Sequence, residues 1–212
     1  MELVAFTIAL AIAYQALKGY RLTKQRTLWY VHFSFAVLSA GLLIDSLTGF
    51  LGIVARTLRG TLSLTWIGYL IYFLAQLLAY SMLIYAYVSQ TRTLGVISTA
   101  APLTSLIGFA ALQAGPAQGI RLLGPLIEYH PIPEIILLFL VLYIAVQTGI
   151  NYSSTKDRNA FLVFLAFLFL TFSHLFFILQ PFGALLFVFG HILQLLGFVS
   201  LFTMLLRVTR KQ

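Results

Sequence analysis

The chain has 212 residues, of which 61% are hydrophobic and 8% are charged, and its formal net charge at pH 7 is +8. A composition this apolar excludes a soluble globular protein and places the chain among membrane proteins. The absence of cysteine excludes disulfides, thiolate metal sites, iron–sulfur clusters and cysteine catalysis.

Seven apolar runs long enough to cross a bilayer follow one another along the chain. The predicted transmembrane helices cover residues 2–19, 27–49, 62–88, 94–113, 132–151, 159–180 and 183–206. The N-terminal run lacks a basic region and a small-residue cleavage site, so we interpret it as a span and not as a signal peptide. The predicted fold class is an all-α integral membrane protein with seven transmembrane helices.

Basic residues are concentrated in the connections on one side of the predicted membrane. Ten of the 13 Lys and Arg residues follow the odd-numbered spans, and only Arg56, Arg59 and Arg121 lie on the other side. Because cytoplasmic loops carry the Lys/Arg excess, the N-terminus is predicted outside and the C-terminus inside. The +8 charge is then a topogenic signal that also suits anionic lipid, and it does not predict a nucleic-acid partner.

The first part of the chain occurs a second time. Residues 2–47 align without a gap with residues 134–179, a shift of 132 positions, and 14 of the 46 aligned pairs are identical. A second block, shifted by 118 positions, pairs Gln76 with Gln194. The polar matches of the first block include Glu2/Glu134, Gln15/Gln147, Tyr20/Tyr152, Thr23/Thr155, Lys24/Lys156 and Arg26/Arg158.

The order of the spans sets the symmetry of this duplication. Matched spans are an even number of crossings apart, so both copies point the same way and form a parallel repeat. The predicted arrangement is 3+1+3. It comprises a first three-helix repeat at 1–92, a linker helix and outer loop at 93–133, and a second three-helix repeat at 134–212.

Two histidines lie inside the predicted spans, where ionisable residues are costly and are functional candidates. His174 and His191 stand on neighbouring helices joined by a tight turn, at similar depth. They could bracket the iron of a haem b or hold a metal. A stripe formed by Gly183, Gly190 and Gly197 could admit a flat macrocycle. Close packing through these small residues and a proton-linked role remain as alternatives.

Four further residues are candidates for a ligand site or a solute path. Gln76 and Gln194 fall near mid-membrane, where an amide needs a partner, so they act as interhelical glue or as the rim of a polar pathway. Tyr72 belongs to a tyrosine-rich third span, and Asp45 lies near the outer end of the second. With Glu2, Glu128, His130 and Glu134, Asp45 could form an outer vestibule that attracts cations, or these residues could simply be hydrated at the membrane interface.

Seven spans with an outside N-terminus and a parallel 3+1+3 duplication resemble the superfamily of SWEET sugar transporters, PnuC-type vitamin transporters and microbial rhodopsins. The resemblance implies transport of a small solute. Two details depart from it. Gln180-Pro181 reverses the order of the PQ-loop pair, and the seventh span has no Lys to carry a retinal Schiff base.

Three functional interpretations follow. The first is a small-solute transporter, channel or receptor, and the second is a b-type haem protein or an integral subunit of an electron-transfer complex. The third is a ligand-free membrane scaffold subunit. No catalytic motif is present, so an enzyme is not expected. The expected partners are the lipid bilayer and other membrane subunits or a homo-oligomer, and the expected location is a prokaryotic plasma membrane.

Overall fold

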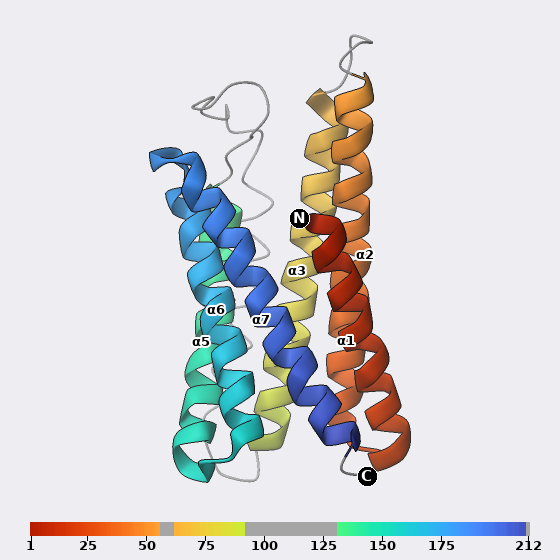
Figure 1. Cartoon of the computed structure of the whole chain (residues 1–212), viewed down its shortest axis with the longest axis vertical. Helices are drawn as coiled ribbons and strands as arrows, with labels where there is room; N and C mark the ends of the chain where they lie inside the picture. Colours follow the sequence, from red (N-terminus) through yellow and green to blue (C-terminus); the bar gives the residue numbers. More distant parts are fainter. Residues whose placement is uncertain (56–61, 92–130, 211–212) are drawn as a thin grey trace. The chain divides into compact units, whose positions relative to one another are not determined.

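The computed structural model describes residues 1–55, 62–91 and 131–210, and these residues form helices joined by short turns (Figure 1). Each of the six long helices contains a stretch long and apolar enough to cross a membrane. The protein is therefore an all-helical, polytopic integral membrane protein, as predicted. The helices are α1 (Glu2–Thr23), α2 (Arg26–Ala55), α3 (Leu62–Thr91), α5 (Pro131–Thr155), α6 (Arg158–Leu179) and α7 (Ala184–Arg210).

Six of the seven predicted spans are confirmed as helices. The predicted fourth span, 94–113, lies outside the described residues, and so does the predicted outer loop up to residue 130. Five of the six helices run past the predicted C-terminal boundary of their span, as α1 does in reaching Thr23. Backbone hydrogen bonding continues through the polar residues at the membrane interface, whereas hydropathy marks only the apolar part of a helix.

The described helices belong to two compact units, each of which is considered by itself. The first unit contains Met1–Ala86 together with Leu201–Gln212, and the second contains Tyr87–Ser200. The first therefore holds α1, α2 and most of α3, and the second holds α5, α6 and most of α7. Within each unit, the first two helices pack side by side as an antiparallel hairpin (Figure 1).

The hairpin of α1 and α2 turns at Lys24. This residue has φ 59°, in the left-handed region, and its backbone N–H donates to the Tyr20 carbonyl at 2.8 Å. Its ammonium lies 5.8 Å from the centre of the Tyr20 ring. The Thr23 hydroxyl donates to the Gly19 carbonyl. A left-handed residue that caps the last helical turn lets the chain reverse within two residues.

The hairpin of α5 and α6 has the same turn at positions 132 residues later. Lys156 has φ 53°, and its N–H donates to the Tyr152 carbonyl at 2.8 Å. Its ammonium lies 5.5 Å from the centre of the Tyr152 ring, and the Thr155 hydroxyl donates to the Asn151 carbonyl. Asp157 caps α6 by accepting hydrogen bonds from two backbone N–H groups of its first turn. This carboxylate cap has no counterpart in the first hairpin, where Gln25 takes its place.

The buried faces of the two hairpins also match position by position. Of the buried residues of α1, all except Gly19 have a buried counterpart 132 positions later in α5. Every buried residue of α6 has a buried counterpart in α2. The matched pairs are 5/137, 9/141, 12/144, 13/145, 16/148, 34/166, 35/167, 38/170, 39/171, 41/173 and 42/174.

The third helix of each unit packs on the second through glycine. A Cβ added to Gly41 of α2 would lie 2.6 Å from the Ala75 Cβ and 3.4 Å from the Tyr72 Cα, both on α3. A Cβ added to Gly197 of α7 would lie 2.9 Å from the Ala166 carbonyl oxygen of α6. In both places the absence of a side chain lets two helix backbones approach closely.

The connection between the second and third helices is longer in the first unit than in the second, as the shorter shift of the second aligned block predicts. Most of the extra residues extend a helix. The α6–α7 connection is a short 3-10 helix, Gln180–Phe182, followed by Gly183. In the first unit, α2 continues to Ala55, although the end of α6 at Leu179 corresponds to Leu47. The fall in the shift from 132 to 118 positions predicts a longer connection after the second span, without saying whether it is a loop. The apolar sequence beyond Leu47 extends the helix.

Candidate functional site

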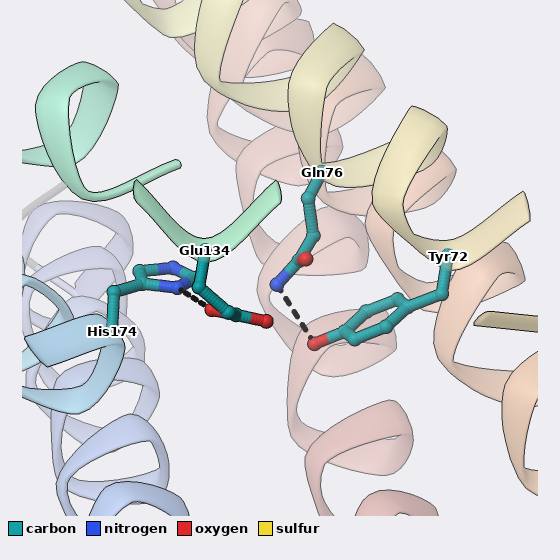
Figure 2. Close-up of polar contacts among 4 residues, drawn as sticks. All are labelled: Tyr72, Gln76, Glu134 and His174. Atoms are coloured by element: carbon teal, nitrogen blue, oxygen red, sulfur yellow. Dashed lines mark hydrogen bonds and ion pairs between the residues drawn. The ribbon is translucent and has the colours of Figure 1, made fainter. Parts of the chain in front are cut away.

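Glu134 and His174 form a bonded pair within two neighbouring spans (Figure 2). Glu134 lies in the first turn of α5, and His174 lies five residues before the end of α6. Glu134 Oε2 and His174 Nδ1 are 2.8 Å apart, and the two side chains are 15% and 2% exposed. With Glu134 ionised, His174 Nδ1–H donates a short, charge-assisted hydrogen bond to its carboxylate.

The local sequence explains both positions. Glu134 follows two prolines at the start of α5, where a carboxylate is also favoured by the positive end of the helix dipole. His174 belongs to the buried face of α6, at the position where the first hairpin carries the buried Leu42. An imidazole placed on a face that packs against α5 needs a polar partner, and Glu134 supplies it.

The first predicted amide, Gln76, finds its partner on its own helix. Its Nε2 donates to the hydroxyl oxygen of Tyr72 at 2.9 Å, one turn earlier on α3 (Figure 2). Gln76 is 3% exposed, so the bond satisfies an amide that would otherwise be costly inside a membrane span. Two of the predicted path residues, Tyr72 and Gln76, are thus brought together.

The matched amide, Gln194, also bonds to a ring one turn earlier. Its side chain forms a hydrogen bond with His191, three residues before it on α7, and Gln194 is 3% exposed. Each of the two matched glutamines therefore has a polar aromatic neighbour on its own helix. That the two amides lie close to a common symmetry axis stays a prediction.

Aromatic rings surround the two histidines. The ring of Phe177 lies edge-on to both imidazoles, with centroids 6.2 Å from His174 and 4.9 Å from His191. Phe187 lies 4.5 Å from His191 in the same manner. A Cβ added to Gly190 would meet the Phe177 ring at 2.6 Å. Phe177 thus packs at the glycine stripe where the sequence suggested space for a flat macrocycle.

The side chains around His174 and His191 give no support to haem b ligation by these residues, which stays a prediction. His174 Nδ1 is bonded to Glu134, and Phe177 packs against both imidazoles. Among residues 1–55, 62–91 and 131–210, no cluster of three or more His, Asp or Glu side chains could hold a metal ion.

Asp45 has one of the other predicted vestibule residues, Glu2, as its neighbour. It is half-buried on α2, and it interacts electrostatically with Glu2 on α1. Glu2 is the counterpart of Glu134, so the glutamate of the first hairpin has a second carboxylate within electrostatic reach, whereas Glu134 is bonded to an imidazole. Two further residues of the predicted outer vestibule, Glu128 and His130, lie outside the described residues.

Comparison with protein-family models, curated proteins and solved structures finds no match for this chain. The resemblance to SWEET, PnuC-type and rhodopsin proteins therefore remains an expectation. The chemistry of the site's own side chains is then the guide to function.

The sequence prediction missed Glu134 as a site residue. It counted this residue only among those of the outer vestibule, and it paired His174 with His191 as ligands of a haem or metal. A usable signal was present, because a tight turn at Lys156 makes α5 and α6 antiparallel neighbours. Glu134 and His174 both lie near the ends of that hairpin farthest from the turn, so similar distances from the turn place them at a similar level.

Proposed function

We propose that the protein is a transporter or channel for a small solute. The observation that carries this proposal is the Glu134–His174 pair, a carboxylate and an imidazole bonded to each other within spanning helices. Ionisable side chains are expensive inside a bilayer, and in membrane proteins they mark substrate, ion or proton pathways. A scaffold subunit without a ligand needs no such pair, since apolar residues would pack the same interface at lower cost.

The proposed architecture is a parallel 3+1+3 arrangement of seven helices with an outside N-terminus. Its support is the position-by-position match of the two hairpins, in their turns at Lys24 and Lys156 and in their buried faces. In this arrangement residues 94–113 supply the linker helix. Transporters built from such repeats bind their solute between the two halves, near mid-membrane. The third helices would then bring Tyr72, Gln76 and Gln194 to the path.

The polar groups available to a solute limit its class. Apart from His174, the buried polar residues of the described chain carry only hydroxyls and amides: Ser34, Ser39, Gln76, Thr148, Thr171, Ser173, Gln180, Gln194 and Ser200. Such groups offer a few hydrogen bonds and no fixed charge. A small, uncharged solute that exchanges one or two hydrogen bonds fits this inventory better than a hydrated ion.

The test is solute entry into liposomes that contain the purified full-length chain. Stopped-flow light scattering would follow swelling in urea, glycerol, erythritol and glucose, with protein-free liposomes as the baseline. We expect faster entry for at least one of the smaller solutes, and slower entry in Gln76→Leu and Tyr72→Phe. Leu74→Ala is the matched control, because Leu74 lies on the same helix and is 49% exposed. Entry at the protein-free rate for every solute, by a folded protein, would refute the proposal.

A further inference from the structure

We propose that Glu134 and His174 together form a binding site for one proton, and that occupancy of this site sets the rate of solute movement. The second half of this proposal rests on the proposed function, whereas the first half does not. The argument starts from the geometry of the pair, with 2.8 Å between Glu134 Oε2 and His174 Nδ1 and His174 almost fully buried.

The net charge of the pair depends on a single proton. An ionised Glu134 that accepts from the Nδ1–H of a neutral His174 carries a net charge of −1. A proton added at Nε2 converts the imidazole to imidazolium, and the pair becomes neutral as a whole. No covalent bond other than N–H forms or breaks, and the proton comes from and returns to water.

This change of charge couples the site to hydration. In surroundings that exclude water, the neutral pair is favoured over a lone negative charge, because burying an uncompensated charge is costly. When water reaches the carboxylate, the charged form is solvated and the proton can leave. Glu134 is the more accessible partner, at 15% exposed against 2% for His174, so it is the side from which water and protons reach the pair.

The described neighbours of the pair include an aromatic ring and a third titratable side chain. Phe177 packs an apolar ring against His174. His191 of α7 is a titratable side chain that lies within electrostatic reach of Glu134 and is itself bonded to Gln194. Apart from Glu134, the formal charges in the described part of the second unit, at Lys156, Asp157 and Arg158, cluster at the opposite end of the hairpin.

The first hairpin has no equivalent of this pair. Glu2 corresponds to Glu134, but Leu42, a buried apolar residue, corresponds to His174. The nearby Asp45 interacts with Glu2 as a second acid. Within the matched hairpins, the imidazole–carboxylate pair is therefore built once, which makes the two halves chemically different.

The direct test measures charge movement without any solute. The full-length chain, reconstituted on a solid-supported membrane, is exposed to a jump from alkaline to acidic buffer, and the transient current reports proton binding. We expect a current from the native protein, and a smaller current in His174→Gln and Glu134→Gln. The exchange variant Glu134→His/His174→Glu keeps both groups in reversed positions, and we expect it to restore the current.

His32→Gln is the matched control, because the His32 imidazole bonds to the backbone carbonyl of Ala13 and not to a carboxylate. Its current should equal that of the native protein. Each variant is compared only after its elution profile shows a folded, monodisperse protein. A native current that His174→Gln leaves unchanged, or the absence of any native current, overturns the proton site.

A second arm separates this inference from the proposed function. The swelling rate is measured in acidic and in alkaline buffer, and we expect it to depend on pH in the native protein and in His32→Gln but not in His174→Gln. A native rate that is the same at both pH values overturns the coupling. If no solute enters while the pH-jump current is present and His174-dependent, the proposed function fails and the proton site stands.

Discussion

Glu134 Oε2 lies 2.8 Å from His174 Nδ1, across two antiparallel helices and 40 residues apart in sequence. The contact joins α5 to α6 at the end of the hairpin farthest from its turn, where no backbone connection holds the two helices together. A bond at this place can hold the open end of the hairpin, so its removal affects folding as well as function.

We predict that His174→Leu lowers the free energy of unfolding by about 3 kcal/mol, because it leaves Glu134 without its imidazole partner. The double variant Glu134→Leu/His174→Leu should return to within about 1 kcal/mol of the native protein, since an apolar pair replaces both groups. Unfolding in SDS, followed by tryptophan fluorescence, measures both values. A loss in the double variant as large as that in His174→Leu would show that the destabilisation does not come from the uncompensated charge of Glu134.

Substitution of the two bonded residues, Gln76 and Tyr72, can distinguish a structural role of the Gln76 amide from a functional one. If Gln76 acts as glue, a double-mutant cycle of Gln76→Leu and Tyr72→Phe should give a coupling energy of about 0.6–2 kcal/mol, as for other hydrogen bonds in membranes. If it lines a solute path, the coupling should be near zero while solute entry falls. Unfolding and swelling measured on the same preparations distinguish the two. A normal result in both assays would exclude Gln76 from either role.

Helix packing predicts opposite effects for two glycines of α2. Gly41→Ala should destabilise the protein by about 1–3 kcal/mol, because its methyl group would press on Ala75 and on the α3 backbone. Gly49→Ala should be neutral or stabilising by up to about 1 kcal/mol, since nothing lies within 4 Å of its added Cβ and alanine favours helix. The same SDS titration compares them. A larger loss at Gly49 than at Gly41 would contradict the packing of α2 on α3.

The proposed orientation predicts which turns a membrane-impermeant thiol reagent can reach in intact cells. The chain has no native cysteine, so single cysteines can be labelled without background. Ser154→Cys, in an exposed position of the predicted inner turn, should resist the reagent until the membrane is opened. Phe182→Cys, in the α6–α7 turn and 84% exposed, should react at once. The reverse pattern would place the N-terminus inside.

Much of the architecture follows from sequence because it depends on local properties. Apolar runs of sufficient length predict the spanning helices, and six of them are present where expected. The tight turns were also foreseeable, since the polar connections at Lys24 and Lys156 are only a few residues long. The register of the buried faces follows from the 132-residue match, because helices with the same pattern and the same turn bury the same positions.

What the sequence could not decide was the partner of each polar side chain. The approximate depth of His174 in the membrane was predictable from span length, but its bond to Glu134 depends on how α5 and α6 rotate about their own axes. Hydropathy contains almost no information about that rotation, because both helices are apolar on every side. Because that rotation was unknown, the sequence suggested space for a macrocycle beside Gly190. In the folded protein the ring of Phe177 lies there. Side-chain contacts between helices are set by packing, and only the tertiary structure reports packing.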